Sequence, residues 1–464
     1  MVFSSLEFIF RFLPIALLLY FIAPRKLKNP ILLIASLFFY AWGEPIYVFL
    51  MIFSCVINYA LAIPIDKYRG TTKSTVALVA SIVVSLALLG FFKYVDFFIG
   101  NINNILGTSI SSLYLPLPIG ISFYTFQILS YTIDVYRNNA PVQKNPVALS
   151  TYITLFPQLI AGPIVRYNTI VKDLTGRKHS IALFTEGVHR FVIGLGKKVF
   201  IANNVALIWE LSKTTADPSV LLSWLGIIGF SFQIYFDFSG YSDMAIGLGR
   251  MLGFRYQENF NFPYISRSIT EFWRRWHMSL SQWFRDYLYI PLGGNRVSMP
   301  RWILNILVVW SLTGFWHGAS WNFMFWGFYF GVLLLVERLF LNKVLERLPG
   351  ALGHIYTLLI VLVSWVIFEL GSPAEIFHYL GNMFAVNGIN IYNFESLYIL
   401  KSNLVLLLIA GIGAVPLFKN VYEKYSNIVF VKAVIMPIFY VVVLTVSIAY
   451  LIDSSFNPFL YFRF

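Results

Sequence analysis

The chain has 464 residues, of which 58% are hydrophobic and only 12% are charged. Soluble domains carry about 25% charged residues, so this composition excludes an ordinary soluble protein and favours one whose apolar surface is covered by lipid. The formal net charge of +13 would fit nucleic-acid binding in a soluble protein. Here, however, the basic residues cluster in short loops between apolar segments, as they do where charge sets the orientation of a membrane protein.

Apolar segments follow one another from end to end, with no long polar linker between them. We therefore predict an all-α polytopic membrane protein with about 11 transmembrane helices, forming one domain over residues 1–464. A helix needs about 20 apolar residues to cross a bilayer. Several segments are shorter or are interrupted by Gly or Pro, which is typical of helices that line a cavity. The segments are 6–23, 31–64 (a predicted hairpin), 75–99, 113–136, 147–161, 184–208, 219–249, 302–317, 321–337, 352–371, 402–418 and 433–452.

The charges of the connecting loops predict the orientation, because cytoplasmic loops carry an excess of Lys and Arg. The segment 250–301 is rich in arginine, whereas 371–400 contains acids but neither Lys nor Arg. The short segment 147–161 has basic loops on both sides, so we expect 137–190 to be re-entrant or interfacial. The loops predicted to be cytoplasmic are 25–28, 67–73, 250–301, 338–350 and 419–432, and those predicted to lie outside are 100–112 and 371–400.

His317 ends an apolar segment that starts near Trp302, directly after the arginine-rich loop. About 16 helical residues extend for about 24 Å of a core about 30 Å thick. We therefore expect His317 deep in the membrane, at the apex of a hairpin that returns along 321–337. Gly314 and Gly318 would leave room for another backbone or a ligand. An ionisable group at this depth is a functional candidate, and burial keeps imidazole neutral, as a general base must be. A core histidine bonded to a neighbouring helix is an equally open alternative.

His277 lies in the sequence EFWRRWHMSLSQWFRDY, residues 271–287. Read as one helix, this segment places His277 on an aromatic stripe, with its arginines elsewhere, as in an amphipathic helix at the membrane interface. Periodicity alone favours the simpler interpretation, in which His277 is one more ring of an aromatic belt. The stripe consists of Trp273, Trp276, His277, Leu280, Phe284 and Tyr287.

Two acids, Asp237 and Asp243, lie within the apolar segment 219–249. Asp243 and Arg250 are seven residues apart on nearly the same helix face and could form an ion pair. Asp237 lacks an obvious local partner and could orient a histidine or bond to a substrate. Structural pairing between helices is the alternative for both acids. Lys198 stands at a predicted helix end, and we expect its amine to extend to the interface.

The sequence lacks a Gly-rich phosphate loop, a zinc signature and the serine motif of α/β-hydrolases. His277 and His317 have no local partner ligands, so we expect no metal and no bound cofactor. The missing nucleophile motif argues against a covalent enzyme intermediate.

Several segments resemble signature sequences of the membrane-bound O-acyltransferase family, in particular its alginate O-acetyltransferase branch. The segment EFWRRWHMSLSQWFRDYLYIPLGGNR resembles a signature of that branch, and GFWHGASW resembles the segment with the family's essential histidine. The resembling segments are 117–127, 156–163, 235–243, 271–296, 314–321 and the C-terminal YFRF at 461–464.

The resemblance implies a ring of transmembrane helices in which a funnel from outside meets a tunnel from the cytoplasm. It makes His317 the essential histidine, acting as general base, and His277 the second histidine position, stabilising the oxyanion or positioning the donor. The residues that it suggests as support or as channel lining are Asp237, Tyr235, Gln127, Trp316, Trp273, Arg285 and Asn295.

The implied activity is transfer of an acetyl group from a cytoplasmic thioester, acetyl-CoA or a carrier-bound thioester, for O-acetylation of an extracellular or periplasmic polysaccharide. The acceptor would be the polysaccharide itself or a secreted SGNH-type acetyltransferase, and the implied location is the bacterial cytoplasmic (inner) membrane. The arginine-rich segment could attract the anionic donor.

Proteins that transfer D-alanyl groups from a carrier thioester to teichoic acid are related, so this acyl group is an alternative. The sequence YIPLGGN at 289–295 and the C-terminal ending favour the acetyl branch. A transporter, or a scaffold for a secreted acyltransferase, is the alternative from another functional class.

Overall fold

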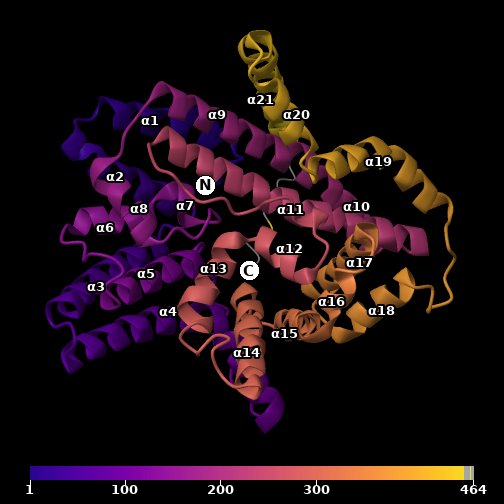
Figure 1. Cartoon of the computed structure of the whole chain (residues 1–464), viewed down its shortest axis with the longest axis horizontal. Coiled ribbons are helices and arrows are strands. Elements are labelled where there is room, and N and C mark those ends of the chain that lie inside the picture. The colour runs from indigo at the N-terminus through magenta and orange to yellow at the C-terminus, as the bar shows by residue number, and fades with distance from the viewer. Residues whose placement is uncertain (454–459, 461–464) are drawn as a thin grey trace. The chain divides into compact units, whose positions relative to one another are not determined.

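The computed structural model describes residues 1–453 and residue 460, and within them it contains helices and no strand (Figure 1). Among the described residues, eight helices are long and apolar enough to cross a membrane, so the predicted all-α polytopic class is confirmed, whereas the count of 11 is not. These helices are Tyr47–Lys67, Thr72–Leu106, Ile181–Thr214, Val220–Met251, Trp321–Leu345, Gly350–Glu369, Phe394–Gly413 and Val431–Asp453.

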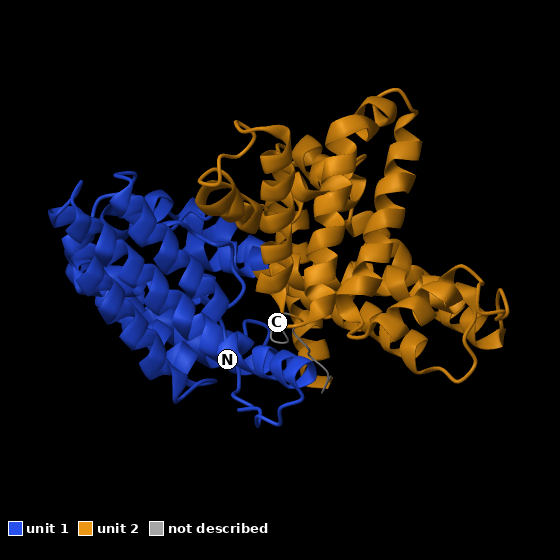
Figure 2. Cartoon of the chain, turned by 90° about the horizontal axis from the view of Figure 1, so that it is seen from below, with its two compact units in different colours: residues 1–191, 242–257 blue, residues 192–241, 258–464 orange. Residues whose placement is uncertain are grey.

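The chain divides into two compact units, which Figure 2 shows in different colours. Unit 1 comprises Met1–Phe191 and Ser242–Gln257, and unit 2 comprises Val192–Tyr241 and Glu258–Phe464. The helix α11 (Val220–Met251) contributes to both units. The single domain over 1–464 that the sequence predicts stays a prediction.

Unit 1 contains the predicted hairpin of 31–64, formed by α2 and α3, and the short helices α6 and α7, which each carry a proline in their first turn. With 9 and 4 residues, α6 and α7 are too short to cross a bilayer, which agrees with the expected re-entrant or interfacial segment. The helices are α1 (Leu13–Ile22), α2 (Lys28–Ala41), α3 (Tyr47–Lys67), α4 (Thr72–Leu106), α5 (Ile121–Tyr136), α6 (Pro146–Thr154), α7 (Phe156–Leu159), α8 (Tyr167–Gly176) and most of α9 (Ile181–Gly196).

The expected pairing of Asp243 with Arg250 is wrong. The carboxylate of Asp243 lies 2.7 Å from the guanidinium of Arg190 on α9, and Arg250 lies 3.8 Å from Glu186. The carboxylates of Asp243 and Glu186 therefore each connect α9 to α11 within unit 1. A contact between two helices has replaced a contact along one helix, because the two helices pack closely enough for Gly187 and Gly247 to face each other.

Unit 2 contains the remaining helices, and several of them continue into a short π-helical segment. The π-helical segments that bear on the site are η5 (Arg285–Tyr289) and η6 (Glu337–Leu341). The helices are α10 (Asn203–Thr214), α12 (Ile269–Arg275), α13 (Met278–Phe284), α14 (Met299–His317), α15 (Trp321–Val336), α16 (Asn342–Leu345), α17 (Gly350–Glu369), α18 (Pro373–Met383), α19 (Phe394–Gly413), α20 (Leu417–Tyr425) and α21 (Met436–Asp453).

Candidate active site

His317 stands at the apex of the α14–α15 hairpin, as the sequence predicts, because α14 ends at His317 and α15 begins four residues later at Trp321. The hairpin is tight because Gly314 and Gly327 let the two backbones touch, and a Cβ at Gly314 would overlap the backbone of Phe323. The 19 residues of α14 extend for about 28 Å. The side chain of His317 is only 4% exposed.

Aromatic rings surround the imidazole of His317. The ring centroids of Trp316, Trp326 and Phe368 lie 5.0, 5.3 and 5.6 Å from that of His317, each nearly perpendicular to it. These aromatic side chains pack edge to face against the imidazole and carry no formal charge. The enclosure therefore excludes water and favours the neutral form of His317 that proton abstraction requires.

His277 lies at a break between α12 and α13, so the single amphipathic helix expected from periodicity is wrong. The backbone of His277 has φ 42° and ψ 54°, in the left-handed region that non-glycine residues seldom adopt. Its side chain is nevertheless fully buried, as the stripe predicts. A conformation of this kind costs about 1–3 kcal/mol and is frequent at functional sites.

Asn259 holds the imidazole of His277 in place. The Asn259 side-chain oxygen lies 3.1 Å from Nδ1 of His277 and accepts hydrogen bonds from the amide and the hydroxyl of Ser279, at 3.3 and 2.9 Å. Because a backbone amide can only donate, this atom must be the oxygen of the Asn259 amide. Nδ1 of His277 therefore carries the proton that Asn259 accepts, and Nε2 carries the lone pair.

The two histidines both lie near the indole of Trp316. The ring of Trp316 is 6.2 Å from that of His277 and 5.0 Å from that of His317. His277 is outside the eight candidate membrane spans, and burial lowers its pKa well below the ordinary value. A positive charge on His317 would lower it further. The geometry therefore supports a pair of neutral imidazoles.

A buried carboxylate on another helix holds the N-terminus of α12. Glu337 accepts hydrogen bonds from the amides of Ile269 and Thr270, at 2.6 and 2.8 Å, and from the Thr270 hydroxyl at 2.6 Å. The first amides of a helix lack partners within the helix and favour a negative charge. Glu337 thus ties α12, which leads directly into His277, to the end of α15.

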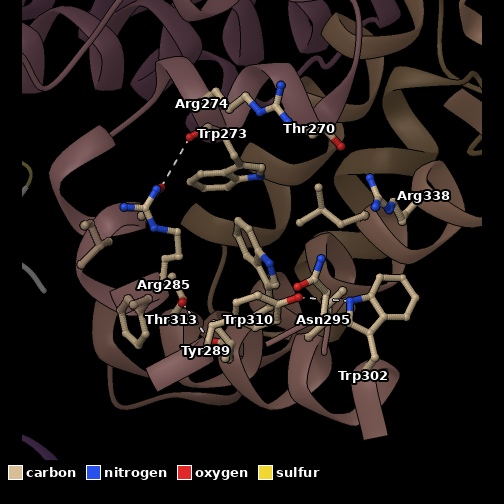
Figure 3. Close-up of a pocket in the computed structure, with 16 residues that line it drawn as sticks. Thr270, Trp273, Arg274, Arg285, Tyr289, Asn295, Trp302, Trp310, Thr313 and Arg338 are labelled. Carbon is tan, nitrogen blue, oxygen red and sulfur yellow. Dashed lines mark hydrogen bonds between the residues drawn. The ribbon is translucent and has the colours of Figure 1, made fainter. Parts of the chain in front are cut away.

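A cavity of about 400 Å³ opens beside α12 (Figure 3). Figure 3 shows the indoles of Trp273 and Trp310 directed into it, with three arginine side chains around them. Aromatic surface combined with guanidinium groups is suited to an anionic ligand that also has apolar parts. The cavity is lined by Thr270, Trp273, Arg274, Leu280, Ser281, Phe284, Arg285, Tyr289, Asn295, Trp302, Ile306, Val309, Trp310, Thr313, Leu334 and Arg338.

The cavity comes within one side chain of His317. Thr313 lines the cavity and precedes His317 by one helical turn, about 6 Å along α14. On the other wall, the ring of Trp273 lies 5.6 Å from that of Trp326, which in turn lies 5.3 Å from that of His317. The imidazole is therefore separated from the cavity by Trp326.

Residues 121–372, which include both histidines and the whole lining of the cavity, match the family model described as MBOAT, membrane-bound O-acyltransferase family. The chain belongs to this family. It is 39% identical to a protein of Azotobacter vinelandii named probable alginate O-acetylase AlgI, over the full length of both chains. It is 36% identical to the peptidoglycan O-acetyltransferase of Helicobacter pylori, over 84% of this chain and 81% of the relative. It is 34% identical to the teichoic acid D-alanyltransferase of Bacillus subtilis, over 50% of this chain and 62% of the relative.

As a multi-pass O-acyltransferase of this family, the chain takes an acyl donor as substrate. Three of the residues suggested by the resemblance, Trp273, Arg285 and Asn295, line the cavity, and the ring of Trp316 lies near those of both histidines. Tyr235 packs against Trp276, with 6.2 Å between ring centroids, next to the break that carries His277. Their roles in the reaction stay predictions.

Gln127 and Asp237, which the resemblance also suggests, are not among the residues that line the cavity. Gln127 is fully buried on α5 in unit 1, where its backbone oxygen accepts from the hydroxyl of Ser130. Asp237 forms a buried ion pair with Lys198, at 2.7 Å, and accepts from the amide of Leu460 at 2.8 Å. The expectation that Lys198 extends to the interface is therefore wrong, since its side chain is 2% exposed. Asp237 therefore contacts this lysine and Leu460.

Sequence reasoning did not find Asn259, Glu337 or Trp326. Asn259 and Glu337 act on residues 18 and 68 positions away, and a lone polar residue contains no signal of so distant a partner. Trp326 is one of two tryptophans on the apolar helix α15 and is equally inconspicuous. Within the described residues no three His, Cys, Asp or Glu side chains come together as a metal site requires, and the expected absence of a metal stays a prediction.

Proposed function

We propose that the chain transfers an acetyl group from a cytoplasmic thioester to a polysaccharide hydroxyl outside the membrane, with His317 as the general base. The supporting observation is the position of His317, enclosed at the hairpin apex and one indole away from an arginine-lined cavity. The names of the relatives, alginate O-acetylase and peptidoglycan O-acetyltransferase, support acetyl as the group and a polysaccharide as the acceptor.

In the proposed reaction, His317 accepts the proton of the acceptor hydroxyl as that oxygen attacks the thioester carbonyl carbon. The new C–O bond forms, the C–S bond breaks, and the departing thiolate takes the proton back from His317 on its way into the cavity. The rings of Trp316, Trp326 and Phe368 keep water from the carbonyl, which protects the thioester from hydrolysis.

For His277 we propose a positioning role rather than oxyanion stabilisation. Its Nδ1 proton is directed to Asn259, so the neutral ring presents a lone pair at Nε2 and can accept a hydrogen bond. An oxyanion requires a donor. A lone pair beside Trp316 is suited to orienting the acceptor hydroxyl toward His317.

Substituting Asn259 tests this role. In Asn259→Asp, a carboxylate would still accept from His277 and Ser279, but its negative charge would favour the imidazolium form and raise the pKa of His277. We expect the acid limb of the kcat/KM profile to move to higher pH, because His277 would lose its lone pair at a higher pH than in the wild type. Asn305→Asp, at a buried amide on α14 that bonds backbone oxygens, is the matched control. An unchanged acid limb in Asn259→Asp would contradict the assignment.

The cavity is the proposed donor site, and acetyl-CoA is the proposed donor. Arg274 and Arg338 line it and, within the described residues, form no ion pair, so their charges are available to phosphate groups. Losing one charge-assisted hydrogen bond costs about 1.5 kcal/mol or more. We therefore expect Arg274→Gln and Arg338→Gln each to raise KM for the donor about ten-fold with a smaller change in kcat. Arg301→Gln, which removes a charge from the start of α14 outside the cavity, should leave KM unchanged.

We place the chain in a bacterial cytoplasmic membrane, with the arginine-rich segment toward the cytoplasm, where acyl thioesters are made. The acceptor is the polysaccharide itself or a secreted SGNH-type acetyltransferase that carries the acetyl group onward. The bacterial sources of the relatives support this location. The basic loops support this orientation.

Incubating the purified protein with labelled acetyl-CoA and separated acceptor fractions tests the function. We expect label to appear covalently on a polysaccharide or partner acceptor. Transfer only from a D-alanyl carrier thioester would instead support the acyl group named in the Bacillus subtilis relative. Movement of label across a reconstituted bilayer without a covalent product would identify a transporter. If neither transfer nor movement of label is observed, a scaffold is the remaining interpretation.

A further inference from the structure

A second cluster of basic side chains lies in unit 1, on residues that follow α1, begin α2 and follow α8. Figure 1 labels these three helices. Arg177 is at the centre of the cluster. The side chain is more than nine-tenths buried, and its guanidinium lies over the rings of Phe254 and Tyr20, at 4.7 and 5.4 Å. A charge buried to this extent normally has an anionic partner.

Within the described part of the chain, every hydrogen bond of Arg177 ends on a neutral oxygen. Its Nε donates to the hydroxyl of Tyr20 at 2.6 Å, and Nη1 donates to the backbone oxygens of Asp173 and Leu174. The carboxylate of Asp173 accepts from the amide of Arg255 instead. Among the described residues, therefore, no acid neutralises the guanidinium charge.

Further cations lie beside Arg177. The amine of Lys28 is 4.6 Å from the centroid of the Tyr20 ring, on which Arg177 also lies. Burial lowers the pKa of His179, and the positive charges of Lys28, Arg177 and Arg25 lower it further. The Tyr20 hydroxyl, 2.7 Å from Nε2 of His179, connects this ring to the same cluster. Like charges so close together repel one another unless an anion lies between them.

Exposed apolar side chains are neighbours of the cluster's cations along the chain. Phe21, Ile22 and Leu27 are 42, 73 and 50% exposed, and they adjoin Arg25 and Lys28 in the chain. The loop 25–28 is predicted to be cytoplasmic, and the cytoplasmic leaflet carries anionic lipids. Apolar side chains beside cations at the end of an apolar helix suit the level of the lipid headgroups.

We propose that Arg25, Lys28 and Arg177 form a binding site for the phosphate of an anionic phospholipid, whose acyl chains lie along Phe21, Ile22 and Leu27. The site is independent of the acyl-transfer site and holds a structural lipid against unit 1. The lipid phosphate supplies the negative charge that no described residue supplies to Arg177.

The test is the retention of lipid by the full-length protein. The protein is purified in detergent, incubated with phosphatidylglycerol, and analysed by native mass spectrometry and thermal denaturation. We expect one phosphatidylglycerol to remain bound and to raise the melting temperature, whereas phosphatidylcholine does neither. A cation near an anionic headgroup contributes about a five-fold factor in affinity, so Arg25→Gln/Lys28→Gln should weaken retention about 25-fold without touching the buried Arg177.

Lys67→Gln/Lys73→Gln is the matched control, because both of these amines lie over the ring of Tyr68, at 5.4 and 5.3 Å, in another loop predicted to be cytoplasmic. The control should retain phosphatidylglycerol like the wild type. Equally weakened retention of phosphatidylglycerol in both double variants, or unweakened retention in Arg25→Gln/Lys28→Gln, would overturn the proposed site. Equal stabilisation by inorganic phosphate would overturn the assignment to a lipid.

Discussion

Replacing His317 with alanine is expected to lower acyl transfer by about 10²–10⁴-fold, the range that a positioned general base contributes. The side chain is enclosed by Trp316, Trp326 and Phe368, so no other base among these neighbours can take its place. The loss should appear in kcat rather than in KM for the donor, because the arginines of the cavity are untouched. The measurement is the rate of label transfer from acetyl-CoA by purified protein at saturating donor.

Two further measurements make this result specific. The His317→Ala variant should melt within a few degrees of the wild type, since the α14–α15 hairpin depends on the glycine contact rather than on the imidazole. His378→Ala, which removes an exposed histidine on α18, should transfer label at the wild-type rate. Wild-type transfer by His317→Ala would reject the imidazole as the base.

The position of His317 could be predicted because it depends on local quantities. The length of α14 sets how far His317 lies from the arginine-rich loop, and the two flanking glycines indicate the tight return of the chain. The polytopic class followed in the same way from the length and composition of the apolar segments. Each of these properties is decided within about 20 neighbouring residues, so a sequence contains enough information to predict it.

The conformation of His277 could not be predicted, because its cause lies elsewhere in the chain. Periodicity from 271 to 287 is continuous, and neither Gly nor Pro marks a break there. The helix ends at Arg275 because the segment packs against Asn259, whose backbone oxygen accepts from Met278 and whose side chain accepts from His277. Helical propensity is a weak preference that such tertiary contacts override.

Charged pairs were the least predictable feature for the same reason. Asp243 and Arg250 satisfy the spacing of a pair on one helix, yet each found a partner on α9. Within a tightly packed helical unit, a neighbouring helix is as close as the next turn of the same helix. Spacing along one helix therefore does not identify the partner of a charged residue whose helix packs against another.

Breaking the buried pair of Lys198 and Asp237 is expected to produce the largest loss of stability in the chain. Both side chains are 2% exposed and their charged atoms lie 2.7 Å apart. Removing one partner leaves an uncompensated charge in the core of unit 2, which costs about 3–5 kcal/mol. Lys198→Met and Asp237→Asn should therefore each lower the melting temperature of the purified protein strongly.

The double variant Lys198→Met/Asp237→Asn distinguishes an ion pair from two separate packing roles. It removes both charges and keeps a side-chain oxygen that can accept from the amide of Leu460. Replacing a complete buried pair is often close to neutral, so the double variant should be more stable than either single variant. If the losses of the two single variants simply add, the charges do not interact and the pair is not what holds this part of the core. The same cycle measured on acyl transfer shows whether the ion pair matters for the reaction, because a purely structural pair would change stability and leave kcat unaltered.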